Sequence, residues 1–211
     1  MSLKGDGAAV LTSWTNGRKA VVELLQDRAG RKIIRKTYRP GFWLAMFREY
    51  IMATYVSRRT CVTPRVVEFH PMAREIVFEY VDGQRVLEWV LSRFGDTSNV
   101  AEFQSFHGLN VDTRVADAFR QFRESCSDEA AQLRQAILDS YLALHGTRIK
   151  HGSADPRNVI YRDGRIFIID FDNARPSLKP WVIDGRDLEH WYGITRPDAR
   201  AASVSARTGH E

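Results

Sequence analysis

The segment HGSADPRNVIYRDGRIFIIDFDNA, residues 151–174, constrains the fold of this 211-residue chain more than any other. A polar loop leads into two short apolar strands, and the Asp163-Gly164 pair between them strongly favours a tight hairpin turn. Asn158 opens the first strand, and Asp170 follows the second, twelve residues later. We therefore expect the side-chain oxygens of these two residues to converge.

Asn158 and Asp170 carry the oxygen ligands that Mg²⁺ prefers, a few from the protein and the rest from phosphate or water. Asp170 follows the apolar run IFII directly. A carboxylate that emerges from a buried strand is costly unless it is bound or paired. The sequence therefore predicts that Asn158 and Asp170 bind Mg²⁺.

The N-terminal part of the chain predicts a compact antiparallel sheet with one helix. Apolar runs bounded by turn residues, among them Asn16-Gly17 and Pro40-Gly41, indicate strands. Five strands are expected, at 8–15, 19–26, 31–39, 65–70 and 75–81. Residues 42–59, after the third strand, predict a helix with an apolar stripe at helical spacing. The stripe consists of Leu44, Phe47, Ile51 and Tyr55.

The rest of the chain has a mainly helical pattern. Helices are expected at 85–94, 114–125, 128–146 and around 184–194. The helix at 128–146 has the clearest pattern, because Asp128 and Glu129 suit the positive end of its dipole. Its buried stripe is expected to be Leu133, Ile137, Tyr141 and Leu144. Residues 95–115 predict no element, and the polar tail 196–211 predicts disorder.

Lys36 and Glu49 are candidates for an ion pair that holds nucleotide phosphates. Lys36 lies in the third strand on the same face as Ile34, because strand side chains alternate. That face would offer Ile34 to an adenine ring and Lys36 to the phosphates, with Lys32 as the rival cation. Glu49 lies beside the apolar stripe of the next helix, where its carboxylate would fix the Lys36 ammonium. Taken singly, each of these charged residues also suits a solvated surface.

In this order and spacing, the candidate residues resemble the protein-kinase-like superfamily. HGSADPRN resembles the catalytic loop, usually His-x-Asp with an Asn five residues after the Asp. DFD at 170–172 resembles the Asp-Phe-Gly motif, and Lys36 and Glu49 resemble the strand lysine and helix glutamate. The resemblance covers roughly residues 8–192.

The resemblance implies an α+β fold of the minimal two-lobe protein-kinase-like type. The N-lobe, residues 1–81, would be an antiparallel sheet plus one helix. The C-lobe, residues 82–211, would be mainly helical and carry the catalytic loop and a short tail. ATP and Mg²⁺ would lie between the lobes. VFEYVDG, residues 77–83, is similar to the hinge strand, which implies that backbone groups near Glu79 and Val81 hold the adenine.

Within the superfamily, the chain looks like the small atypical members: RIO kinases, the small kinase of the KEOPS complex and lipopolysaccharide Kdo kinases. Its loop begins His-Gly rather than His-Arg, and DGRDLEHW follows Asp170 too closely for a long activation segment. We therefore expect the usual peptide-binding helices to be absent. The resemblance implies that Asp187 braces the catalytic loop from the following helix, and that His151 braces the same loop.

The catalytic loop departs from the family pattern at one important position. Five residues before Asn158 stands Ser153, where the family has Asp, and Asp155 falls two residues later. In one account Asp155 takes over, because the aspartate in this loose phosphoryl transfer mainly orients the acceptor. In the other account Ser153 marks a pseudokinase, which binds nucleotide and transfers phosphate slowly or not at all. His151, Ser153 and Asp155 are therefore the candidate catalytic residues.

Two further departures are milder. TSWTNGR, residues 12–18, has one glycine where the nucleotide loop usually has several. Asp172 replaces the glycine of Asp-Phe-Gly, which removes backbone freedom at that position. We expect Asp172 to lie at the surface, with a place near the metal as the alternative.

These observations favour an ATP-dependent phosphotransferase, a kinase, that acts on a hydroxyl group. A protein Ser or Thr is preferred over a sugar as the acceptor. One alternative is a nucleotide-binding pseudokinase that regulates a partner. Another is a small-molecule kinase of the aminoglycoside type, whose His-Gly-Asp loop HGSADPRN also resembles.

Composition sets the remaining limits. The formal net charge is +5, and we predict no specific nucleic-acid partner, although a basic surface also suits phosphate or an anionic membrane. Cys61 and Cys126 have no metal-ligand spacing, which favours a reduced compartment. The N-terminus lacks an apolar signal core, and no run approaches the roughly 18 apolar residues of a membrane span. We expect no transmembrane segment and a cytoplasmic location, with signal-independent secretion left open.

Overall fold

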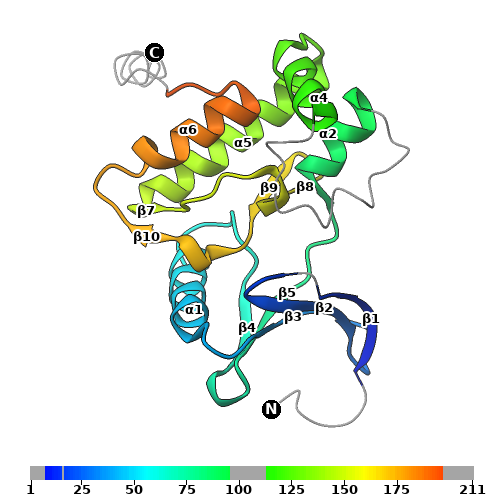
Figure 1. Ribbon diagram of the computed structural model, residues 1–211, viewed down its shortest axis with the longest axis vertical. Helices are drawn as coiled ribbons and strands as arrows, with labels where there is room; N and C mark the ends of the chain where they lie inside the picture. The colour runs from blue at the N-terminus through cyan, green and yellow to red at the C-terminus, as the bar shows by residue number, and fades with distance from the viewer. Residues whose placement is uncertain (1–7, 16, 96–112, 197–211) are drawn as a thin grey trace, which may run out of the picture.

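The computed structural model describes residues 8–15, 17–95 and 113–196. In Figure 1 the N-terminal sheet and helix α1 form one part of the molecule, and the remaining helices form a second part above it. Most of the stretch without an expected element and nearly all of the tail expected to be disordered lie outside the described residues, as does the Asn16 half of the Asn16-Gly17 turn.

The N-terminal part is a five-stranded antiparallel sheet with the order β1-β2-β3-β5-β4. Its strands are β1 (Ala9–Trp14), β2 (Ala20–Gln26), β3 (Lys32–Tyr38), β4 (Val66–His70) and β5 (Glu75–Glu79). A 3-10 turn, η1 (Pro71–Ala73), joins β4 to β5. Each strand lies inside the range that its pattern of apolar and turn residues predicts, so this sheet is confirmed.

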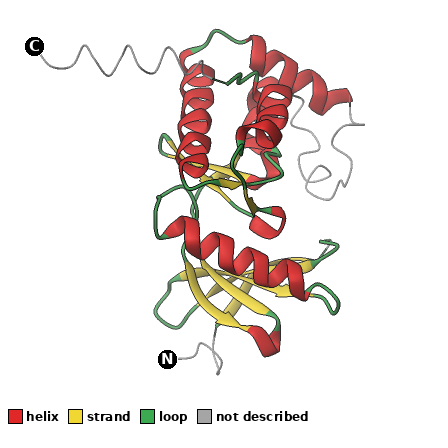
Figure 2. Ribbon diagram, turned by 90° about the vertical axis from the view of Figure 1, so that its left-hand side faces the viewer, coloured by secondary structure: helices red, strands yellow, loops and turns green. Residues whose placement is uncertain are grey.

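Helix α1 (Trp43–Ser57) follows β3, as predicted, and packs against β4 and β5. Figure 2 shows it lying over the strands of the sheet. Its buried residues are Met46, Glu49, Ala53 and Val56. The apolar stripe that marks the helix in the sequence lies on the opposite face, where all of its side chains are exposed. Periodicity therefore locates this helix correctly but does not identify its buried face.

The C-terminal part contains four helices in the described residues: α2 (Val86–Phe94), α4 (Thr113–Glu124), α5 (Asp128–Gly146) and α6 (Trp181–Tyr192). A small sheet of β6 (Gln84–Arg85), β8 (Val159–Arg162) and β9 (Arg165–Ile168) has the order β6-β8-β9. A second pair joins β7 (Ile149–Lys150) to β10 (Arg175–Pro176). Two 3-10 turns, η4 (Pro156–Asn158) and η5 (Phe171–Asn173), flank the β8–β9 hairpin. The mixed α+β class is confirmed.

Helix α5 organises the core of the C-terminal part. Its predicted stripe of Leu133, Ile137, Tyr141 and Leu144 is fully buried. Ser127 caps the helix by accepting a hydrogen bond from the backbone N–H of Ala130, which satisfies one of its free first-turn donors. Aromatic residues of α4 and α6 pack edge to face in the same core, with the Phe119 and Trp191 ring centroids 5.1 Å apart. This core holds the β8–β9 hairpin rigidly beneath α5.

Among the described residues, no helix combines the length and apolar character needed to cross a membrane.

Candidate functional site

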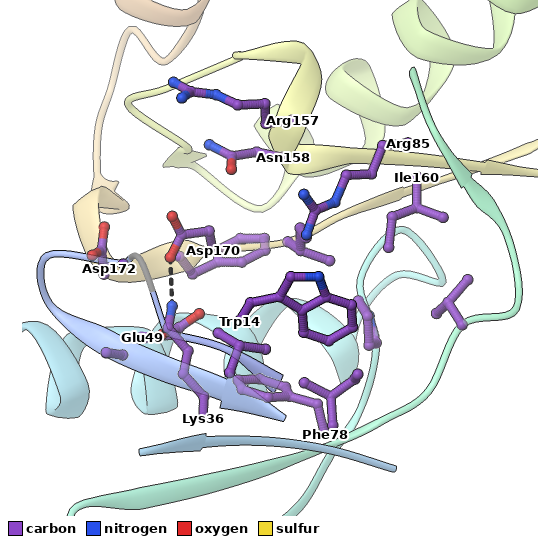
Figure 3. Close-up of a pocket in the computed structure, with 18 of the residues that line it drawn as sticks. Trp14, Lys36, Glu49, Phe78, Arg85, Arg157, Asn158, Ile160, Asp170 and Asp172 are labelled. Atoms are coloured by element: carbon purple, nitrogen blue, oxygen red, sulfur yellow. Dashed lines mark hydrogen bonds and ion pairs between the residues drawn. The ribbon is translucent and has the colours of Figure 1, made fainter. Parts of the chain in front are cut away.

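A cleft of about 630 Å³ lies between the N-terminal sheet and the β8–β9 hairpin. This volume is typical of small-molecule sites. Apolar side chains from both parts of the molecule line it, namely Trp14, Val22, Leu24, Ile34, Phe78, Val81, Ile160 and Ile169. Charged side chains line it too: Lys36, Glu49, Asp170 and Asp172 lie on one side, and Arg85 lies beside Ile160 (Figure 3). The cleft thus offers an apolar surface beside a polar end, which suits a ligand with a flat ring and a charged tail.

Lys36 joins the two parts of the molecule at the polar end of the cleft (Figure 3). Its Nζ lies 2.7 Å from Glu49 Oε2 on α1 and 2.5 Å from Asp170 Oδ1, which follows β9. Tyr38, two residues along β3, donates its hydroxyl hydrogen bond to Glu49. The predicted Lys36–Glu49 pair is therefore present in the structure, and Asp170 joins it from the other side of the cleft.

Burial and charge pairing set the protonation of this trio. Burial works against the charge on Lys36, but the Asp170 and Glu49 carboxylates outweigh it and raise the pKa of Lys36 well above its ordinary value. Burial raises the pKa of Glu49, more than the Lys36 charge lowers it. For Asp170 the balance is reversed, because the Lys36 ammonium overcomes burial and lowers its pKa. The Lys36 ammonium thus favours the ionised form of Asp170, which is the form that a metal ligand requires.

Asp170 has a left-handed backbone conformation, with φ 67° and ψ 62°. This conformation costs a non-glycine residue about 1 kcal/mol or more, and it persists only where the surroundings impose it. Here Asp170 leaves a buried strand and immediately enters the turn η5, whose Phe171 is buried against His151. The strained residue is the one that turns a carboxylate into the cleft.

Asn158 lies at the end of η4, directly before β8, and faces the same space as Asp170 (Figure 3). Its Nδ2 lies 3.3 Å from the hydroxyl oxygen of Ser153 and 3.4 Å from its carbonyl, both of which accept hydrogen bonds. The amide nitrogen thus turns toward the loop, which leaves the amide oxygen for a ligand. The predicted convergence of Asn158 and Asp170 agrees with this arrangement.

The donor set fits a metal that brings further oxygens with it. The described residues contain no group of three or more His, Cys, Asp or Glu side chains that would bind a metal ion. One carboxylate and one amide oxygen match Mg²⁺, which commonly takes one or two protein ligands and completes its shell with phosphate and water. The Asn158–Asp170 pair therefore suits Mg²⁺ bound together with a phosphate ligand.

The 151–158 loop is fixed from α6 by two aspartates. Asp184 is completely buried and accepts hydrogen bonds from the backbone N–H groups of His151 and Gly152, both at 2.7 Å. It also lies 2.8 Å from His145 Nε2. Asp187 accepts a bond from the Ala154 N–H at 3.0 Å. Asp187 was the expected brace. Asp184, in the same DGRD motif, carries more of the contacts and was missed.

The pKa of Asp184 reflects these partners. Burial favours the neutral acid, but the contacts with His145 and the two backbone N–H groups outweigh it and hold the pKa below its ordinary value of 3.8. His151 is fully buried, and its two ring nitrogens lie 2.6 and 2.9 Å from the carbonyl oxygens of Ser153 and Ile169. His151 therefore supports the loop from within, as expected, and does not line the cleft.

Ser153 and Asp155 are placed differently. Ser153 lines the cleft. Asp155 caps η4 and holds Arg157 with both carboxylate oxygens, Oδ1 to Nε at 2.9 Å and Oδ2 to an NH₂ group at 2.7 Å. Such a bidentate pair is strong and geometrically specific. Arg157 lines the cleft and Asp155 does not, so the loop presents a serine and an arginine to the cleft.

The expected adenine-binding residues Ile34, Glu79 and Val81 all line the cleft. The Glu79 N–H donates to the carbonyl oxygen of Arg65, and the Val81 carbonyl accepts from the Gly83 N–H. Trp14 was not expected here. In Figure 3 its indole lies between the Lys36–Asp170 pair and Phe78. It provides a stacking surface for a planar ring. Only its place shortly before the Asn16-Gly17 turn could have suggested it.

Asp172 is almost completely buried, so the expectation that it lies at the surface was wrong. Its Oδ2 lies 2.7 Å from Lys19 Nζ at the start of the β2 hairpin, and its backbone carbonyl accepts from Arg48 of α1 at 3.2 Å. Its other carboxylate oxygen is buried without a hydrogen-bond partner. Lys19 thus compensates for the buried Asp172 carboxylate, and this ion pair forms a second link across the cleft.

Neither a scan against protein-family models nor a search of curated proteins finds a match for this chain. The functional argument therefore rests on the residues of the cleft.

Proposed function

We propose that this chain is an atypical member of the protein-kinase-like superfamily that binds Mg·ATP and transfers a phosphoryl group to a hydroxyl acceptor. Residues 1–81 would be its N-lobe and residues 82–211 its C-lobe. The observed sheet order, with one helix after β3, and the position of the cleft support this proposal.

The single observation that carries the proposal is the Lys36 trio. A lysine on a strand, a glutamate on the following helix and an aspartate after a hairpin strand are far apart in sequence, yet they meet in one cleft. A buried ammonium between two carboxylates is poorly explained by stability alone, because desolvation offsets much of the attraction. Such a cluster in a cleft is typical of a functional site.

Each expected residue then has a place relative to the ligand. Ile34, Trp14 and Phe78 would contact the adenine ring, together with backbone groups near Glu79 and Val81. Lys36 would hold the phosphates. Asn158 and Asp170 would hold Mg²⁺, which when bound neutralises charge on the phosphate oxygens. In the present structure the Lys36 ammonium is paired with Asp170, so phosphate and metal would replace that ion pair with two new ones.

The acceptor would approach from the 151–158 loop. Ser153 faces the cleft and is oriented by Asn158, so it is placed to contact an acceptor hydroxyl. For Asp155 to orient that hydroxyl, its carboxylate must exchange Arg157 for the acceptor. A protein Ser or Thr remains the preferred acceptor, and a sugar hydroxyl is the alternative.

A second candidate function is that of a nucleotide-binding pseudokinase. The specific observation in its favour concerns Asp155, the carboxylate closest in sequence to Ser153. Asp155 is bound to Arg157 and does not line the cleft. In that case the loop would hold the nucleotide in place and leave it intact.

The test is transfer of label from γ-labelled ATP with Mg²⁺ to proteins of a cell lysate and to a lipopolysaccharide extract. Wild type is compared with Asp170→Ala and Asp155→Ala, and Mg·ATP binding is measured in parallel. We expect label with wild type and none with Asp170→Ala. Label lost in Asp155→Ala with binding intact assigns Asp155 to the acceptor, and unchanged turnover removes that role. Binding without label in the wild type establishes the pseudokinase.

A further inference from the structure

The outer face of α1 is made of large apolar side chains. The exposed positions of this helix are Trp43, Leu44, Phe47, Ile51 and Tyr55, whose exposed fractions run from 37% to 80%. Figure 2 shows this helix in front of the sheet, with no other described element in front of it. A surface helix normally turns polar residues to water. This one is apolar on its outer face and buries a glutamate on its inner face.

Charge along the same segment has one sign. The nearest exposed charged residues beyond the two ends of the face are Arg39, Arg58 and Arg59. Between residues 39 and 59 the single acidic residue is Glu49, which is buried and paired with Lys36. The Arg59 guanidinium lies 3.7 Å from the centre of the Tyr55 ring, so a cation borders the apolar surface directly.

A second copy of the chain is a poor occupant for this face. A stable dimer interface takes about 800 Å² and 20–30 residues from each partner, whereas this face offers five side chains of one helix. Two copies would also bring arginine against arginine, since a two-fold interface presents the same patch twice. A partner surface that is apolar in its interior and negative at its rim matches both features.

We propose that the outer face of α1 binds the surface of an anionic lipid membrane. Leu44, Phe47 and Ile51 would enter the boundary between headgroups and acyl chains. Trp43 and Tyr55, at the two ends, have the amphipathic rings that favour this interface. Arg58 and Arg59 would contact lipid phosphates. Arg39, whose guanidinium donates to the Thr15 and Gly17 carbonyls, would add positive charge at the other end of the face. This proposal is independent of the proposed phosphotransfer, because it uses none of the residues that line the cleft.

The test is cosedimentation of the full chain with vesicles of equal parts phosphatidylcholine and phosphatidylglycerol, and with phosphatidylcholine alone. The test variant is Leu44→Ser/Ile51→Ser. The matched control is Leu11→Ser/Val10→Ser, which removes one leucine and one β-branched residue, 45% and 53% exposed, from β1 at the opposite edge of the sheet. Thermal melts of both variants check folding.

We expect wild type and the β1 variant to bind the anionic vesicles, with weaker binding to the neutral ones and in high salt. The α1 variant should bind at least tenfold more weakly while melting cooperatively. Wild type that stays in the supernatant, or an α1 variant that binds like wild type, overturns the proposal. Light scattering without lipid gives one more contrary outcome. If the wild type self-associates and the α1 variant is monomeric, the face is a dimer interface and the proposal is overturned.

Discussion

The Lys36 end of the cleft and the 151–158 loop differ in whether their charged side chains point into the cleft. At the Lys36 end, ammonium and carboxylates meet inside the cleft, where phosphate and metal would exchange with them. In the loop, the carboxylate of Asp155 is bound by Arg157 of the same turn, and serine occupies the position toward the cleft. The two regions are joined by Asn158, which contacts Ser153 and faces Asp170.

Under the proposed function, this difference would make nucleotide binding and phosphoryl transfer separable. Phosphoryl transfer relies on positioning and charge neutralisation more than on proton removal, so a site can keep its phosphate-binding half and change its acceptor half. We expect phosphoryl transfer to be lost when a charged residue of the Lys36 end is removed. We expect substitutions in the 151–158 loop to change the transfer rate less, and either up or down.

The largest expected effect is the loss of phosphoryl transfer in Lys36→Met, which tests the Lys36 end of the cleft. Removing the ammonium leaves Glu49 and Asp170 facing each other in a buried site, without a cation for the phosphates. We expect label transfer to fall by about 100-fold or more. Lys32→Met, an exposed lysine four residues earlier on the same strand, is the matched control and should keep wild-type transfer. Equal losses in both variants would remove Lys36 from the site.

Asp184→Ala tests whether the loop depends on its brace. Loss of the carboxylate leaves the buried N–H of His151 and the half-buried N–H of Gly152 without acceptors, which should lower the free energy of unfolding by about 3 kcal/mol. Urea unfolding measures it. Because the folded pKa of Asp184 lies below 3.8, its contribution is present above that pH and is lost as pH falls through the folded value. Asp184→Asn should therefore flatten the acid limb of the stability curve, and an unchanged limb would contradict this account.

Ser153→Asp tests whether the 151–158 loop limits the rate of phosphoryl transfer. It places a carboxylate toward the cleft beside Asn158, where the proposed acceptor hydroxyl would be oriented. We expect transfer to rise about tenfold with little change in ATP affinity. Initial rates with γ-labelled ATP measure this effect. A fall in rate would show that the loop is built around serine, because the new charge would repel the phosphates.

The smallest expected effect concerns the second link across the cleft. Lys19→Met removes the cation from buried Asp172, and because Lys19 is partly exposed we expect a loss of about 1 kcal/mol in unfolding free energy. Adding Asp172→Asn to Lys19→Met should recover most of that loss. If the losses of the two single variants simply add, the two side chains are not coupled.

Much of this architecture was predictable because the responsible signals are local. Strand limits, the Asp163-Gly164 turn and the buried stripe of α5 all follow from alternation, turn chemistry and helical spacing within a few residues. Lys36, Glu49, Asn158 and Asp170 were identified because their order along the chain resembles a known family. The structure adds the contact between Lys36 and Asp170, which lie 134 positions apart.

What was missed depends on contacts between distant segments. The burial of Asp172 follows from Lys19, which no local pattern connects to it. Asp184 and Asp187 look alike in sequence, and only the position of α6 under the loop distinguishes them. The apolar stripe of α1 has helical spacing yet faces outward, because the helix buries its other face, which carries Met46, Ala53, Val56 and the paired Glu49.

The most direct test of the central claim is calorimetric titration of the wild-type protein with ATP, with and without Mg²⁺. The account predicts saturable binding at one site with a Kd below about 1 mM. This binding should weaken strongly without Mg²⁺ and disappear in Lys36→Met. No heat of binding at saturating Mg·ATP, or equal binding by wild type and Lys36→Met, would contradict the claim that this cleft is a nucleotide site.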